Sequence, residues 1–112
     1  MVMKLVSAVI VPHRFAAVQE ALRRFGVHGL TVSEVLEHDG CPHSEFYRGQ
    51  RFTVDLSPHV RLDIVAHDSD TADLVHIILR VAGSHAGDGT VWVTPVESLV
   101  RVRTGHRGVV AL

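Results

Sequence analysis

The strongest constraint on the fold is a strand–helix–strand pattern that occurs twice within 112 residues. Residues 4–11, KLVSAVIV, are almost continuously apolar and β-branched, as in a central strand, and Pro12 ends the run. Residues 14–25 place apolar side chains at three- and four-residue spacing, which puts them on one helical stripe, and Gly26 is a suitable C-cap. Residues 29–37, GLTVSEVLE, alternate apolar and polar side chains, which predicts a half-buried strand.

The second half of the chain repeats this order with different residues. Residues 53–67 carry strand signals, and Ser69 or Asp70 is the expected N-cap of an amphipathic helix that ends near Gly83. Residues 90–96, TVWVTPV, form the last expected strand. Two such halves predict an α+β fold, a ferredoxin-like βαββαβ sandwich with two helices on one face of an antiparallel sheet.

Composition limits the range of functions. A chain of this length that is 46% hydrophobic suits one domain, residues 1–112, small enough to gain from burying further surface in an oligomer. With 11 basic and 12 acidic side chains it lacks the broad positive surface of a nucleic-acid-binding protein. The single cysteine, Cys41, excludes an internal disulfide and fits a reducing, cytoplasmic location. No apolar run approaches the roughly 20 residues that span a bilayer, so we expect a protein that is not membrane-embedded.

Residues 37–52, EHDGCPHSEFYRGQRF, contain two glycines and a proline and show little periodicity. We interpret this segment as a long excursion from the sheet. Connections of this length are uncommon in small domains and are usually functional where they occur.

Two features near the end of the chain are suited to an anion. Gly87 and Gly89 flank Asp88, and glycines allow consecutive backbone N–H groups to converge on a negative charge, although the same tripeptide is also an ordinary turn. Arg101 and Arg103 stand two apart, so on an extended backbone both would project to one side. A phosphate shared by both guanidinium groups is one interpretation, and a solvated edge with carboxylate neighbours is the other.

Five segments resemble the PII nitrogen-signalling proteins in order and spacing, and the resemblance covers essentially the whole chain. The segments are GLTVSEV (29–35), EFYRG (45–49), GDG (87–89), VTPVE (93–97) and RVRTG (101–105). The resemblance implies a homotrimer that binds adenine nucleotides in the clefts between subunits. It also implies a long protruding loop, here residues 37–56, that docks on a partner such as a transporter or a nitrogen-metabolism enzyme.

The resemblance also assigns site residues. On the phosphate side it implies Gly87, Asp88, Gly89, Thr90, Arg101 and Arg103. On the adenine and ribose side it implies Gly29, Leu30, Thr31 and Val65.

Several departures from the family pattern change the expected ligand. The start of the loop lacks the family's glutamine, and Thr90 and His59 stand where the family has lysines. These losses disfavour binding of Mg²⁺-ATP together with 2-oxoglutarate. They also imply that the protein discriminates less strongly in favour of ATP over ADP or AMP. Phe52 replaces the tyrosine that is uridylylated in many members, and Gln50 replaces a phosphorylated serine, so signalling through bound ligand alone is implied.

Nine histidines are many for this length, and four candidate metal ligands lie within six residues: His38, Asp39, Cys41 and His43. Imidazole, thiolate and carboxylate groups bind zinc or copper, although a solvated loop with incidental histidines is the simpler interpretation. The alternative function is therefore a trimer of the same fold that senses a metal or a small anion such as bicarbonate. No nucleophile and base form a recognisable catalytic motif, so we expect a regulator rather than an enzyme, with weak ATPase activity left open by the resemblance.

Overall fold

The computed structural model describes residues 2–47, 50–83 and 89–112, and within these it describes no side chains for residues 39–47 and 50–55. The chain runs through β1 (Met3–Ile10), a 3-10 turn η1 (Pro12–Arg14), α1 (Phe15–Phe25), β2 (Thr31–Tyr47), β3 (Gln50–His67), α2 (Asp68–Ala82), β4 (Thr90–Pro95) and a second 3-10 turn η2 (Gly108–Ala111).

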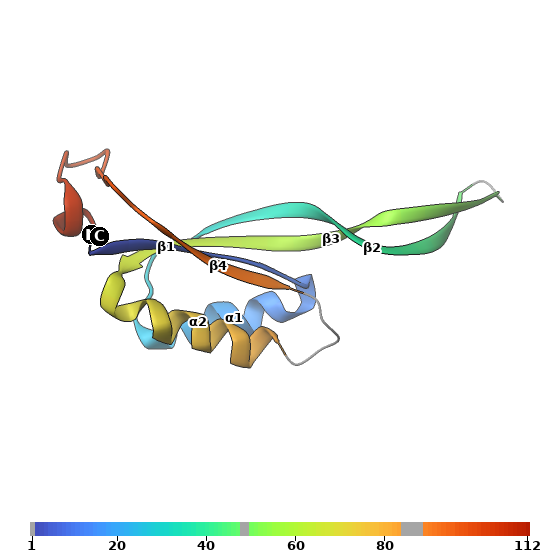
Figure 1. Ribbon diagram of the computed structural model, residues 1–112, viewed down its shortest axis with the longest axis horizontal. Helices are drawn as coiled ribbons and strands as arrows, with labels where there is room; N and C mark the ends of the chain where they lie inside the picture. Colours follow the sequence, from blue (N-terminus) through green and yellow to red (C-terminus); the bar gives the residue numbers. More distant parts are fainter. Residues whose placement is uncertain (1, 48–49, 84–88) are drawn as a thin grey trace.

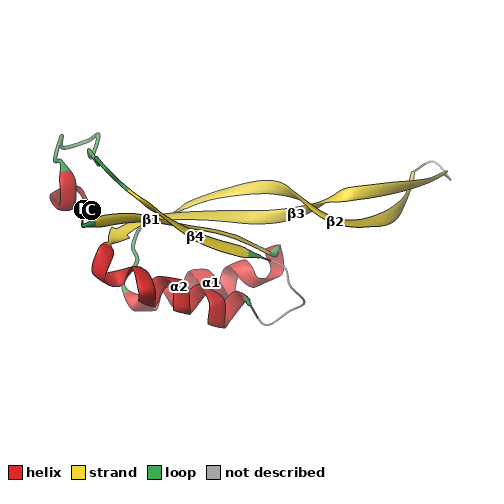
Figure 2. Ribbon diagram, viewed as in Figure 1, coloured by secondary structure: helices red, strands yellow, loops and turns green. Residues whose placement is uncertain are grey.

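The four strands form one antiparallel sheet in the order β2-β3-β1-β4. Each helix connects an edge strand to a central strand, and both helices lie on the same side of the sheet (Figures 1 and 2). The predicted ferredoxin-like α+β fold is confirmed.

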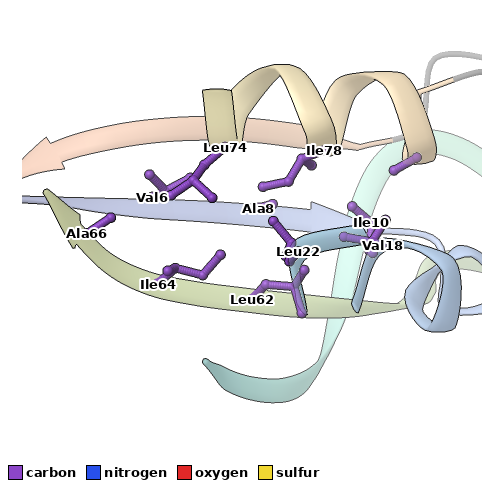
Figure 3. Packing of buried hydrophobic residues seen from close by; sticks show 11 residues of the cluster. Val6, Ala8, Ile10, Val18, Leu22, Leu62, Ile64, Ala66, Leu74 and Ile78 are labelled. Atoms are coloured by element: carbon purple, nitrogen blue, oxygen red, sulfur yellow. The ribbon is translucent and has the colours of Figure 1, made fainter. Parts of the chain in front are cut away.

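The core lies between the helices and one face of the sheet (Figure 3). Alternate residues of the central strands point to it, because successive strand side chains face opposite sides. From the sheet these are Val6, Ala8, Ile10, Leu62, Ile64 and Ala66, and from the helices Val18, Leu22, Leu74, Ile78 and Ala82. Arg14 joins the two helices at the surface, because its Nε donates to the Val81 carbonyl oxygen at 3.1 Å.

Helix α1 follows the predicted stripe and ends as expected. Gly26 has φ +118°, and its N–H donates to the carbonyl oxygens of Leu22 and Arg23 at 3.2 and 3.0 Å. This left-handed conformation favours glycine, so Gly26 is the C-cap. Phe25, the last apolar residue of the predicted stripe, is 41% exposed, because it lies where the helix leaves the core.

The predicted N-cap of α2 is wrong. The helix already begins at Asp68, and His67 occupies the cap position with an extended backbone and no side-chain hydrogen bond. The N–H of Asp68 donates instead to the Val2 carbonyl oxygen at 2.6 Å, so strand β3 leads directly into the helix. Asp68 and Asp70 lie in the first turn, where negative charge favours the helix dipole.

The segment interpreted as a long excursion from the sheet is strand at residues 37–47 and 50–52. Ile10 at the end of β1 pairs with Val60, so residues 50–59 of β3 pair with β2 alone. We call residues 35–47 and 50–59 the ribbon. It extends well beyond the rest of the sheet (Figure 1), and the molecule measures 56 × 28 × 21 Å. In a two-stranded hairpin each strand pairs on its inner side, and the outward backbone groups can be solvated by water.

Candidate functional site

A pocket of about 640 Å³ lies at the end of the sheet away from the ribbon. It lies between the loop that follows α1, the last residues of β3, the first turns of α2 and the C-terminal segment. Its walls include four residues expected to bind a nucleotide, Gly29, Leu30, Thr31 and Val65, together with Arg101. The structure thus gathers segments that are far apart in the sequence.

Hydrogen bonds hold the start of the loop after α1, whereas its middle, at Gly29, has free space around the backbone. The C-cap at Gly26 turns the chain, and the Val27 N–H donates to the Leu22 carbonyl oxygen at 3.0 Å. Leu30 packs against the core, and Thr31 begins β2. At Gly29 an added Cβ would meet no atom within 4 Å, so the subunit itself does not require a glycine there.

The C-terminal segment brings Arg101 to the pocket by a tight turn. The Arg101 N–H donates to the His106 carbonyl oxygen at 2.9 Å, and the Gly105 N–H donates to the Arg101 carbonyl oxygen at 2.7 Å. The Arg101 side chain folds toward the end of the chain, where Nε donates to the Ala111 carbonyl oxygen at 2.9 Å. Its two terminal nitrogens have no hydrogen-bond partner among the described residues.

This turn corrects the expectation for the arginine pair. Residues 102–104 form a turn that is closed at Gly105, where φ is +74°. The backbone is therefore not extended, and spacing by two does not place both guanidinium groups on one side. Arg101 lines the pocket, whereas Arg103 is exposed on the turn and does not line it.

Gly89 and Thr90, which the resemblance assigns to the phosphate side, do not line this pocket. Thr90 pairs with Val9, whereas Val65 in the pocket pairs with Leu5. Four residues of strand separate these positions, roughly 13 Å at the usual rise of about 3.3 Å per residue. Gly89 precedes Thr90 with φ +117°, and an added Cβ would lie 3.1 Å from the Val9 carbonyl oxygen. Gly87 and Asp88 are outside the described residues.

The sheet face opposite the helices carries a charged network that sequence reasoning missed. Ser7 is fully buried and donates from Oγ to the Asp63 carboxylate at 2.7 Å, and Arg61 donates to the same carboxylate at 3.1 Å. The Arg61 guanidinium also lies 5.1 Å from the centre of the Trp92 ring. Burial raises the pKa of Asp63, but the hydrogen bonds from Arg61 and Ser7 outweigh it and hold that pKa below its usual value. The alternation of side chains along β1 and β3 would have predicted that Ser7, Arg61 and Asp63 share the sheet face opposite the core.

A second pocket of about 520 Å³ lies at the base of the ribbon. His59, at a family lysine position, is 6% exposed there, with Nδ1 3.1 Å from the Ser57 carbonyl oxygen. Its neighbours in the pocket wall include Pro12, Glu34 and Leu36. The sequence pattern did not indicate that this histidine would be buried.

The candidate metal ligands lie largely beyond the described side chains. His38 is exposed, and the side chains of Asp39, Cys41 and His43 lie outside the described residues. Among the side chains that the structure does describe, no three histidine, cysteine or acidic residues form a group that could hold a metal ion. In the same part of the chain, no helix is long and apolar enough to cross a membrane.

Comparisons with known proteins agree on one family. Residues 3–106 match the family described as Nitrogen regulatory protein P-II. The nitrogen regulatory protein P-II of Azospirillum brasilense is 39% identical over 108 residues, which cover 95% of this chain and 96% of the relative. GlnK of Escherichia coli K12 is 35% identical over 112 residues, 98% of this chain and 100% of the relative. The crystal structure of Arabidopsis thaliana PII bound to citrate superposes with a TM-score of 0.77 at 28% identity and covers 99% of this chain and 92% of that one.

Proposed function

Because the chain belongs to the nitrogen regulatory protein P-II family, we propose that this signalling regulator binds an adenine nucleotide between the subunits of a homotrimer. In this proposal the occupied cleft controls a partner protein through the ribbon. The observation that carries it is the pocket that gathers Gly29, Leu30, Thr31, Val65 and Arg101. An apolar pocket wall suits the adenine ring of a nucleotide, and a guanidinium at the same pocket suits its phosphate groups.

The separation of the two candidate half-sites supports a site between subunits. The pocket lies at one end of the sheet, and Gly89 and Thr90 lie about four residues away along β1. One subunit would then supply the adenine and ribose side with Arg101 and Arg103, and its neighbour would supply the turn from Gly87 to Thr90. The exposed turn at residues 102–104 would let Arg103 reach into the neighbouring subunit.

The sheet face without helices supports the homotrimer. Leu5, Val65 and Trp92 remain partly exposed on this face, where Ser7 is fully buried and donates a hydrogen bond to the half-buried Asp63 carboxylate. A sheet face of this kind is stabilised when another layer covers it. Neighbouring copies of the chain would provide that layer.

The residues around the phosphates favour a nucleotide of lower charge. Thr90 replaces a lysine in the family pattern, so one cation is missing beside the terminal phosphate. His59 replaces a second lysine, and its Nδ1 is within hydrogen-bond distance of a backbone carbonyl oxygen. We expect binding of ADP or AMP with affinity close to that of ATP, and little effect of Mg²⁺ with 2-oxoglutarate.

The ribbon is the element proposed to contact the partner, such as a transporter or an enzyme of nitrogen metabolism. Phe52 removes the hydroxyl used for uridylylation in many relatives, so control would rest on the bound nucleotide alone. Such control requires the nucleotide to favour one ribbon conformation over another, because only differential affinity shifts a population.

Isothermal titration calorimetry with ATP, ADP and AMP, each with and without Mg²⁺ and 2-oxoglutarate, tests the proposal. The R101A/R103A variant should lose roughly 10- to 100-fold in nucleotide affinity, since a hydrogen bond to a charged group contributes about 1.5–3 kcal/mol. R80A on α2 removes an exposed guanidinium away from the pocket and should bind like the unaltered protein. Equal affinity of R101A/R103A and R80A would refute the proposed site, and analytical ultracentrifugation would report whether both remain trimers.

A further inference from the structure

The C-terminal segment after β4 folds back on itself as a short hairpin. The Arg101 N–H donates to the His106 carbonyl oxygen at 2.9 Å, and the Gly108 N–H donates to the Leu99 carbonyl oxygen at 2.8 Å. The segment lies at the end of the sheet away from the ribbon (Figure 1). These hydrogen bonds fix the point at which the chain enters η2, and residues 109–112 therefore return toward the pocket.

The turn η2 has one side at the pocket and one side in solvent. Ala111 is 2% exposed and lines the pocket together with Leu112. Val110, the residue before it, is 71% exposed and does not line the pocket. The Leu112 N–H donates to the Val109 carbonyl oxygen at 3.1 Å, which leaves the Ala111 carbonyl oxygen free to accept from a side chain.

That side chain is Arg101, whose Nε donates to the Ala111 carbonyl oxygen at 2.9 Å. A guanidinium group is planar and rigid, so one hydrogen bond at Nε restricts the orientation of the whole plane. The terminal nitrogens Nη1 and Nη2 have no hydrogen-bond partner among the described residues. Together they form an edge that can donate two parallel hydrogen bonds to one phosphate group.

We propose that η2 is a positioning element for nucleotide binding: the Ala111 carbonyl oxygen orders the Arg101 guanidinium so that Nη1 and Nη2 face a phosphate group of the bound nucleotide. This inference rests on the proposed function. An arginine that becomes ordered only when a ligand arrives loses side-chain entropy on binding. Ordering by η2 beforehand removes part of that loss, so η2 strengthens the binding of phosphate groups that it does not itself contact.

The proposal predicts an effect on the phosphate groups and not on the base. Adenosine has the base and ribose but no phosphate, so the ratio of ADP affinity to adenosine affinity isolates the contribution of Arg101. Isothermal titration calorimetry of a variant that lacks residues 109–112 should show this ratio reduced roughly 2- to 10-fold, the effect of leaving one long side chain unordered. V110A is the matched control, because it alters the solvent side of η2 and should keep the ratio of the unaltered protein.

A double-mutant cycle shows whether η2 acts through Arg101. In an R101A background, removal of residues 109–112 should leave the ratio of ADP to adenosine affinity unchanged, because the side chain that η2 orders is already absent. A reduction of the same size with and without R101A would overturn the positioning role. Absence of ADP binding to the unaltered protein would refute the proposed function, whereas normal ADP binding with an unchanged ratio in the shortened variant would refute the positioning role alone.

Nuclear magnetic resonance gives a second readout that needs no nucleotide. In the ¹⁵N-labelled, nucleotide-free protein, the Arg101 Nε–H should exchange with water several-fold more slowly than that of the exposed Arg103, because only the former is hydrogen-bonded. The two signals are assigned by their loss in R101K and R103K. The slow exchange should disappear on removal of residues 109–112 and persist in V110A. Equal exchange rates at both arginines of the unaltered protein would overturn the proposal.

Discussion

The helix-covered sheet and the ribbon are made from the same two strands but are stabilised differently. Near the helices, β3 is paired on both sides and places Leu62 and Ile64 in the core. In the ribbon, β3 has β2 as its only partner, and none of the described ribbon residues belongs to the core cluster. An isolated two-stranded hairpin is only marginally stable in water, so the ribbon depends on its anchorage in the sheet. Packing against the helices therefore stabilises only one end of this pair of strands.

The largest expected effect comes from testing this separation directly. Leu22 of α1 is fully buried, whereas Leu56 in the ribbon is 41% exposed. L22A should lower the free energy of unfolding by about 2–5 kcal/mol, because it leaves a cavity in the core. L56A should cost less than about 1 kcal/mol, since little apolar surface is lost from the interior. Urea unfolding at one fixed protein concentration measures both.

Equal losses for L22A and L56A would contradict the comparison. They would indicate that the ribbon is buried in the assembled protein and contributes to a core. L62A, on the central strand β3, is the positive control, because Leu62 is buried to the same degree as Leu22.

Two glycines sharpen the comparison at the candidate site. Gly89 has φ +117°, and a Cβ there would lie 3.1 Å from the Val9 carbonyl oxygen, whereas a Cβ at Gly29 meets no atom within 4 Å. G89A should therefore destabilise the protein by about 1–3 kcal/mol. G29A should leave the melting temperature nearly unchanged and weaken nucleotide binding, if the ligand packs against that backbone.

Differential scanning calorimetry with and without ADP distinguishes these outcomes. A G29A variant that retains full ADP stabilisation would show that the loop after α1 does not contact the nucleotide. A G89A variant that melts like the unaltered protein would show that the turn relaxes to accept a side chain.

The helical and central-strand parts of the fold could be predicted because burial imposes a period. Val18 and Leu22 in α1, and Leu74 and Ile78 in α2, repeat at helical spacing since one side of each helix must face the sheet. None of the described ribbon residues belongs to the core cluster, so no core-facing period could be recognised there, and Gly40 and Pro42 interrupt the sequence pattern. Its strands follow from pairing between distant residues, which no local window of sequence reports.

The sequence grouped several residues that line one pocket, but it did not predict the local backbone geometry there. Gly29, Thr31 and Val65 line one pocket, and their role in binding a nucleotide stays a prediction from the resemblance. The spacing of Arg101 and Arg103 was misleading, since the hydrogen bond between the Gly105 N–H and Arg101 closes a turn. Spacing implies a shared face only when the intervening backbone is regular.

The smallest expected effect concerns the open sheet face and its dependence on pH. The hydrogen bonds from Arg61 and Ser7 hold the pKa of Asp63 below its usual value against the opposing effect of burial. A carboxyl whose pKa is lower in the folded state stabilises the fold above its unfolded pKa, near 3.9. That stabilisation should be lost as the pH falls through the folded value.

D63N should remove this contribution, so its free energy of unfolding should vary less between neutral pH and about pH 3 than that of the unaltered protein. Urea unfolding across this range measures the difference. E20Q is the control, because it removes a carboxylate that is exposed on the surface of α1. Arg23 and Arg24 lower the pKa of Glu20 to about 2 there. If D63N and the unaltered protein lose stability in parallel below about pH 4, the network is not coupled to folding. The stability of the open sheet face would then rest on its strand pairing and not on the Asp63 hydrogen bonds.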